Sequence, residues 1–538
     1  MKKWIGITLV VLMLVVFLSA CGQDGPPGVE SQAQGEQGQA TNQQAPDTGS
    51  QAGGNELADD HRYGGTLRVV ETTVAGGPLG TVWNIAIGDT WLVAPIKQNL
   101  VREFPDASVE PLLARDWSID EENSILTFYL QEGVVFHDGS PFNAEVVKWN
   151  FDMTSENMAL GFPFETEVID TYTVAIYLPN GFTNASVGWF GHVNFRLMSM
   201  EAYLTHGYDW VMENPIGTGP FRLVEYSPGS HAAYERFEDY WESGKPFLDR
   251  VEFHMITDVM TLDMALRVDH GEGAIDGVRT QNAQQVAMFR EMGYQTPHIT
   301  AMVKSLFPSS DNPDSPWSNH YVRLALSAAI DRDAIVAARG FGVWYPMYQF
   351  IVSARPSHVT DPGYGVPRFD PDYARELLAR GGFPDGFNTT IIAQPGAADR
   401  EAIVAIQSML ADVGIVAELE FPEAAGFVAT RVGGWEGILT HTVTNFVHIE
   451  NNFTALFGQE ANQFFSMRNS DELEELGWAA HVFGDNRAEI RAAQSYMLDE
   501  GLVIPLWAQP ATAIMRPGVL GWCDRTNWFW FPDMWLDW

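Results

Sequence analysis

His137 and Asp138 are an adjacent pair whose side chains could act together in acid–base catalysis. Neighbouring residues of a strand point to opposite faces, and Asp138 begins the turn Asp138-Gly139-Ser140-Pro141, so a structural role is favoured. The sequence also lacks H-E-x-x-H, G-x-S-x-G, the phosphate-binding G-x-x-x-x-G-K and a paired C-x-x-C. These observations predict a protein that is not an enzyme.

Two other chemistries stay open. His441 and His448 suggest a metal chelate, but two histidines without a nearby cluster of histidines and carboxylates are a thin ligand set. We therefore expect no metal and no cofactor. Glycosidase carboxylates have no fixed spacing and Asp and Glu are plentiful, so a secreted glycan hydrolase remains an alternative.

The N-terminus carries the pattern of a bacterial lipoprotein signal. Lys2 and Lys3 precede an apolar run that ends in Leu18-Ser19-Ala20-Cys21. We expect cleavage after residue 20 and acylation of Cys21, which would hold the protein outside the cytoplasm at a membrane surface. The alternative is a transmembrane anchor, but the apolar run of about 17 residues is at the short limit for spanning a bilayer.

Composition restricts the partners. The formal charge of −38 argues against nucleic acid and anionic lipid, which would be repelled. It could attract cationic ligands, or provide solubility in a salty medium. Cys21 is assigned to lipid and Cys523 has no partner, so no internal disulfide is expected, and we expect a monomer.

The chain alternates strand and helix patterns after a polar tether at residues 21–61. Strand patterns cover residues 66–70, 124–130 and 415–421. Asn143 and Asp370 are expected to cap helices, and a further helix is expected at about 399–412. In the helical stretch 321–330, Arg323 and Asp331 mark a polar face and a break. This alternation predicts an α/β fold.

Five segments in the same order resemble the bacterial extracellular solute-binding protein family 5, the oligopeptide, dipeptide and nickel-type binding components of ABC importers. The segments are Val134–Val147, Pro215–Phe221, Val322–Arg332, Asp370–Gly386 and Gly501–Leu506. The residue types of each segment also have a local physical reason. In Gly217-Thr218-Gly219-Pro220, for example, the glycines let the chain reverse. The resemblance covers nearly all of residues 62–538.

The resemblance implies a two-lobed type II periplasmic-binding-protein fold with an inserted subdomain, in which the lobes join at a hinge and close on a ligand. Lobe I would comprise residues 62–300, including the inserted subdomain at about 100–210, and the C-terminal return at 506–538. Lobe II would comprise residues 301–505. The implied function is capture of an oligopeptide or similar solute between the lobes and delivery to a membrane permease. An oligosaccharide-binding protein of the same fold and a surface sensor or adhesion protein are alternatives.

By the same resemblance, three regions face the ligand: near Trp83 to Trp91, near Trp344-Tyr345, and from Trp435 to Asn445. Aromatic and polar side chains there would stack on the ligand and orient it. The predicted ligand-binding residues are Trp83, Trp91, Trp344, Tyr345, Trp435, Thr440, His441 and Asn445.

The third of these regions departs from the family pattern. Peptide-binding members carry an aspartate there for the ligand's α-amino group, whereas residues 437–450 contain no Asp. Burial of an amine without a counter-charge costs several kcal/mol. Either Glu450 replaces this aspartate, or the ligand is neutral, such as an oligosaccharide or a blocked peptide.

Overall fold

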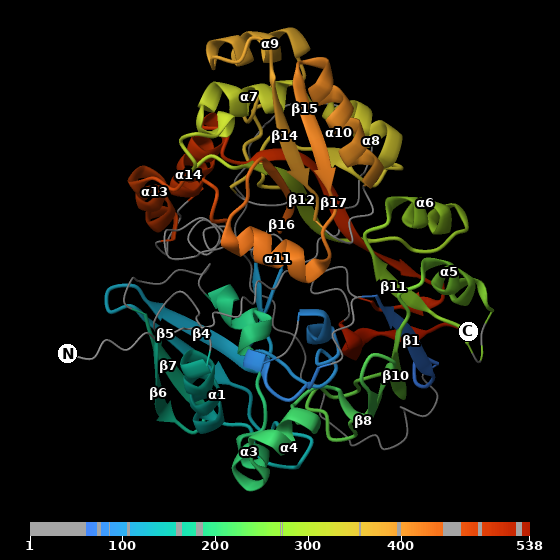
Figure 1. Cartoon of the computed structure of the whole chain (residues 1–538). Helices are drawn as coiled ribbons and strands as arrows, with labels where there is room; N and C mark the ends of the chain where they lie inside the picture. Colours follow the sequence, from blue (N-terminus) through green and yellow to red (C-terminus); the bar gives the residue numbers. More distant parts are fainter. Residues whose placement is uncertain are drawn as a thin grey trace, which may run out of the picture.

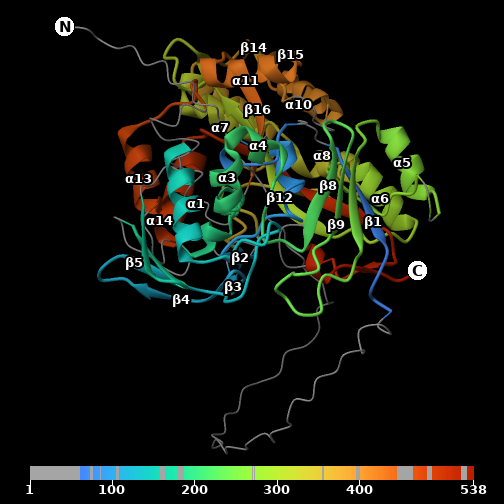
Figure 2. The same cartoon turned by 90° about the horizontal axis from the view of Figure 1, so that it is seen from below.

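One large sheet runs through the molecule, with helices packed around it (Figures 1 and 2). The computed structural model describes residues 61–72, 77–84, 87–104, 108–157, 164–178, 187–269, 271, 273–353, 357–394, 400–444, 464–481, 487–522 and 530–538. The predicted signal, most of the tether, and Cys21, Cys523, Asn445, His448 and Glu450 lie outside these residues. Within them, no helix has both the length and the apolar character that crossing a bilayer requires.

Eleven strands of the described residues form the large sheet, in the order β15-β14-β16-β12-β17-β11-β1-β10-β9-β8, with β13 paired to β17 beside this path. Their bounds are β1 Thr66–Glu71, β8 Phe221–Ser227, β9 His231–Arg236, β10 Arg250–Met255, β11 Gly277–Thr280, β12 His298–Pro308, β13 Tyr345–Pro346, β14 Phe387–Ile392, β15 Ile415–Glu420, β16 Ile438–Thr444 and β17 Ile504–Met515. The long strands β12 and β17 are antiparallel to each other and lie between two groups of parallel strands.

The two parallel groups run towards each other. Strands β1, β10 and β11 are parallel, and β11 pairs antiparallel with the late residues of β17. Strands β14, β15 and β16 are also parallel, and β16 pairs antiparallel with the late residues of β12. The carboxyl ends of both groups therefore face the middle of β12 and β17.

A second, four-stranded sheet has a hydrophobic core of its own. Its order is β4-β5-β7-β6, with bounds Ala114–Asp120, Ile125–Leu130, Thr173–Tyr177 and Glu165–Asp170. Helix α1 (Ala144–Asn157) packs on it, and its Phe151 contacts Phe190 with ring centroids 5.3 Å apart. This sheet lies within the residues expected to form the inserted subdomain.

The other helices mostly surround the large sheet (Figure 1). Their bounds are α3 Met200–His206, α4 Tyr208–Glu213, α5 Val259–Arg267, α6 Ala283–Glu291, α7 His320–Ala328, α8 Arg332–Arg339, α9 Pro371–Arg380, α10 Arg400–Asp412, α11 Ala424–Gly433, α13 Asp471–His481 and α14 Arg487–Asp499. The short elements that matter below are η2 Val82–Asn84, η3 Ile87–Trp91, β2 Val101–Glu103 and η5 Val193–Phe195.

Local sequence signals fix several element ends, as predicted. The Asn143 Oδ1 accepts from Val146 N at 3.1 Å at the start of α1. The Asp370 Oδ1 accepts from Tyr373 N at 2.9 Å at the start of α9, and the Asp331 Oδ1 caps α8. The predicted helix at about 399–412 and the strand that follows it are confirmed as α10 and β15.

The prediction that Arg323 marks a polar face is wrong. Arg323 is fully buried in α7. Its guanidinium donates to the carbonyl oxygens of Trp317, Ser318 and Glu500 at 2.7–2.9 Å. A buried arginine is stable here because main-chain acceptors from two distant segments surround it.

Gly217 and Gly219 are also required by close backbone packing, and the chain bends at residues 218–220. A Cβ at these positions would lie 2.1 Å from Ile96 O and 2.3 Å from Pro95 O, respectively. The same segment accepts from His137, whose Nε2 lies 2.9 Å from Gly219 O. The Asp138 Oδ2 accepts from Ser199 Oγ at 2.6 Å. Both residues of the pair therefore hold loops together, and their structural role is confirmed.

Candidate functional site

The carboxyl ends of both groups of parallel strands point towards the middle of β12 and β17, and the candidate site lies there. In open α/β sheets, ligands bind beyond the carboxyl ends of the strands. Here two such sets of ends oppose each other, so side chains from both halves of the sheet converge on one region.

Two glutamines and a tryptophan form a hydrogen-bonded chain on one side of this region. Gln281 directly follows β11 and is exposed. Its Oε1 accepts from Gln509 Nε2 at 3.2 Å, and the Gln509 Oε1 accepts from Trp507 Nε1 at 3.2 Å. Gln509 and Trp507 alternate along β17 and therefore share a face of the sheet.

A second polar group lies on the other side. Lys304 on β12 pairs with Trp507 on β17 and with Thr442 on β16, so these side chains share a face. The Gln394 Oε1, just beyond β14, accepts from Thr442 N and Thr442 Oγ1 at 3.0 Å and lies 3.5 Å from Lys304 Nζ. Thr440 accepts from Gln394 N at 2.9 Å, which makes it a support for Gln394.

Trp344 and Tyr345, two of the predicted ligand-binding residues, lie beside Trp507 of this region. The Trp344 ring stacks on Trp507 with centroids 5.3 Å apart and an interplanar angle of 10°. Both tryptophans are buried, so this pair forms the floor of the region rather than an open platform. Burial raises the pKa of Tyr345 to about 12, so its hydroxyl stays protonated and can donate a hydrogen bond.

Trp91 contacts a buried ion pair between Arg279 and Glu71, the last residue of β1. The Arg279 guanidinium covers the Trp91 ring at 4.8 Å, and Arg279 Nη2 lies 3.6 Å from Glu71 Oε1. Burial lowers the pKa of Arg279, while Glu71 opposes that shift. Trp83, by contrast, packs against Met198, Ala202 and Val211 in a separate small cluster.

His441 and Trp435 lie away from the polar group. His441 pairs with Ser305 across β12 and β16, on the face opposite Thr440 and Thr442. Its ring contacts Phe427 and Phe464, with centroids 6.1 and 5.4 Å away. Trp435 is buried and donates from Nε1 to Phe307 O at 3.1 Å. The structure thus divides the predicted residues of this segment between two faces.

The surroundings of His441 predict a pH-dependent stability. Burial, followed by Arg431 and Lys304, lowers the pKa of His441 to about 3. In the unfolded chain this histidine takes up its proton at about pH 6.5. Between that pH and about pH 3 the unfolded chain therefore binds more protons than the folded chain, so the free energy of unfolding falls as the pH falls. Between pH 7 and pH 4.5, we expect the free energy of unfolding of His441→Gln to fall by about 2 kcal/mol less than that of the unaltered protein, as measured by urea unfolding.

The exposed His206 provides the matched control. His206→Gln should leave the pH dependence as in the unaltered protein. An unchanged dependence in His441→Gln would contradict the buried, neutral state of His441.

The sequence patterns did not indicate seven residues that the structure places at or beside the candidate site: Glu71, Arg279, Gln281, Lys304, Gln394, Trp507 and Gln509. One signal was present: Lys304 interrupts the apolar run Ala301–Pro308. In the described part of the chain, no group of three or more His, Cys, Asp or Glu side chains could hold a metal ion.

Comparisons with known proteins agree on the type of molecule. The family described as bacterial extracellular solute-binding proteins, family 5 Middle, matches residues 108–464. The glutathione-binding protein GsiB of Salmonella typhi is 29% identical over 350 residues, which cover 63% of this chain and 65% of that protein. GsiB of Escherichia coli O157:H7 is 28% identical over 346 residues with the same coverage. The match therefore spans less than two thirds of these relatives' length.

Solved structures are similar over most of the chain. The periplasmic binding protein DppA of Helicobacter pylori, in complex with the peptide STSA, has a TM-score of 0.75 at 20% identity and covers 89% of this chain and 100% of its own. NikA of Brucella suis, in complex with Fe(III)-EDTA, has a TM-score of 0.77 at 20% identity, with coverage of 88% and 100%. This similarity confirms the predicted two-lobed type II periplasmic-binding-protein fold.

Proposed function

Because this chain belongs to the bacterial extracellular solute-binding proteins of family 5, we propose that it is the substrate-binding lipoprotein of an ABC importer. It captures an oligopeptide or a similar solute between its lobes and delivers it, unaltered, to a membrane permease. Acylated Cys21 holds it at the outer side of the cell membrane, and it works as a monomer. The lobes divide within β12 and β17, at about residues 300 and 506.

The arrangement of Gln281, Gln509 and Gln394 is the observation that carries the proposed ligand class. Each primary amide offers both donors and an acceptor, which is the complement that a peptide backbone requires. Gln281 and Gln394 follow the ends of β11 and β14 in the two halves of the sheet, and Gln509 lies on β17 between these strands, so one extended ligand can contact all three amides. Trp507 and Trp344 supply the apolar floor beneath it.

Two relatives support a peptide-like ligand: GsiB is named for glutathione, and DppA was solved with the peptide STSA. The absence of Asp from residues 437–450 supports a ligand whose amino end is neutral or bound elsewhere. The oligosaccharide receptor and the glycan hydrolase are the competing outcomes of the test.

A ligand screen by thermal unfolding tests this proposal. We expect tri- to pentapeptides, free or N-acetylated, or glutathione to raise the Tm by about 3 °C at a hundredfold excess over Kd, since a ligand that binds only the folded state stabilises it. Malto-oligosaccharides and nickel–histidine should have no effect. A sugar that alone raises Tm, or turnover of a chromogenic glycoside, would contradict the proposal.

The place of binding can be tested separately. Gln509→Met should lower the affinity for the active ligand at least tenfold, because it removes an amide and leaves Gln281 without its partner. The control is Gln284→Met, an exposed glutamine on α6 that should bind as the unaltered protein does. Equal affinity in the two variants would place the site elsewhere.

A further inference from the structure

Lys97 and Arg196 are two buried cations outside the proposed ligand region. Only four lysines follow the predicted signal, and Lys97 is 2% exposed; Arg196 is 6% exposed. Among the described residues, no carboxylate oxygen lies within 4 Å of a nitrogen of either side chain. A buried charge without a counter-charge is costly.

Main-chain carbonyl groups satisfy only part of these two cations. The Lys97 Nζ donates to Leu79 O at 3.1 Å and to Gly80 O. The Arg196 Nη1 donates to Thr90 O at 2.6 Å, its one hydrogen bond to a described residue. A guanidinium has five N–H groups, so Arg196 keeps further donors for another acceptor.

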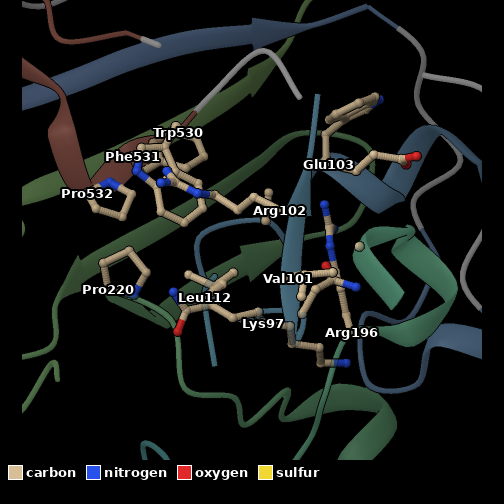
Figure 3. Close-up of a pocket in the computed structure, with 15 residues that line it drawn as sticks. Lys97, Val101, Arg102, Glu103, Leu112, Arg196, Pro220, Trp530, Phe531 and Pro532 are labelled. Atoms are coloured by element: carbon tan, nitrogen blue, oxygen red, sulfur yellow. The ribbon is translucent and has the colours of Figure 1, made fainter. Parts of the chain in front are cut away.

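Both side chains line the same cavity of about 60 Å³ (Figure 3). It lies between β2, Gly191 and Arg196 on either side of η5, and residues Trp530–Pro532. Figure 3 shows Lys97 and Arg196 beside Val101, with Arg102 reaching towards Trp530. The volume admits a few water-sized groups, whereas sites for drug-sized ligands are several times larger.

The cavity walls carry more positive than negative charge. Arg102 also lines the cavity; its Nη2 pairs with Glu110 at 2.9 Å, and its buried Nε has no acceptor among the described residues. Glu103 contributes one carboxylate to the walls. Three cations therefore face one anion around a space too small for a peptide.

We propose that this cavity binds one small monovalent anion, of the size of chloride, between Arg196 and Lys97. The anion supplies the counter-charge that the described residues do not provide, and Arg196 donates to it with N–H groups that Thr90 leaves free. The same two cations hold the carbonyl groups of Leu79 and Gly80, just before η2, and of Thr90, within η3. These short helices carry Trp83 and Trp91. Bound anion thereby fixes this segment.

The titration of Lys97 agrees with this geometry. With the cavity unfilled, burial and then Arg196 lower the pKa of Lys97 to about 7. A bound anion acts in the opposite direction, because a nearby negative charge favours the ammonium form.

Anomalous diffraction from crystals grown in sodium bromide is the decisive test. We expect a bromide peak in the cavity, in contact with Arg196. Bromide peaks at the surface alone would mean an adventitious ion only and would overturn the proposal. A map without bromide peaks would overturn it as well.

Thermal unfolding gives a second readout that does not depend on crystals. At constant ionic strength, replacement of methanesulfonate by chloride should raise Tm by about 2 °C in the unaltered protein. Lys148→Met, at a surface lysine paired with Asp152, should keep this rise, and Arg196→Gln should lose it. A rise of the same size in Arg196→Gln would place the chloride effect elsewhere and overturn the proposal; if Arg196→Gln does not fold, the bromide map decides.

Discussion

Replacement of Arg332 by methionine should lower the free energy of unfolding by about 3–5 kcal/mol. Arg332 is fully buried at the start of α8. Its Nε donates to Pro505 O at 2.7 Å, and its Nη groups donate to Ser327 O at 3.1 Å and to Ser327 Oγ at 2.8 Å. Methionine fills much of the space but donates no hydrogen bond, so buried acceptors on two segments are left without their donor.

The position of Pro505 extends the effect to the junction of the two halves. Pro505 belongs to the first residues of β17, the strand that contains Gln509 and pairs with β11. Arg332 therefore fixes where β17 enters the sheet. We expect ligand affinity to fall together with stability in Arg332→Met, while the peptide class that binds stays the same.

Urea unfolding at pH 7 measures the stability change. Arg332→Lys is the informative comparison: it keeps a charge but lacks the planar fork, and we expect it to recover less than half of the loss. Arg375→Met, at an exposed arginine of α9, is the control for arginine removal and should change stability by less than about 0.5 kcal/mol. A loss below 1 kcal/mol in Arg332→Met would show that water or other donors replace the guanidinium.

Helix ends were predictable because their causes are local. Asn143 and Asp370 each bond to a backbone N–H three residues along the chain, so the cap is visible in a short stretch of sequence. Arg323 looked like a surface residue because its acceptor Glu500 O is 177 residues away. No local pattern indicates such a partner.

The candidate site was predictable in part for the same reason. Trp344 and Tyr345 were named from their own segment and lie beside β17, whereas Gln509 depends on Gln281, 228 residues away. Thr440 and His441 are neighbours on β16, and strand alternation sends them to opposite faces. A family resemblance can place a segment at a site, but it does not say which of two adjacent side chains faces the ligand.

Arg279→Leu should be the most damaging change near Trp91. Glu71 is 1% exposed and Arg279 is 6% exposed, so leucine would remove the cationic member of a buried ion pair. Loss of one member of a buried ion pair costs about 3–5 kcal/mol. Protonation of Glu71 can relieve this cost, so we expect the loss to be greater at pH 8 than at pH 5, as measured by urea unfolding.

The double variant Glu71→Leu, Arg279→Leu separates pairing from packing. Removal of both charges avoids an uncompensated ion, so we expect the double variant to be more stable than Arg279→Leu, with a coupling energy of at least 1 kcal/mol. Additive losses without pH dependence would mean that the 3.6 Å contact is not an effective ion pair. Because Arg279 also covers Trp91 at 4.8 Å, ligand affinity should stay low in the double variant even where stability recovers. That outcome would distinguish an arginine that orients the Trp91 ring from one that only neutralises Glu71.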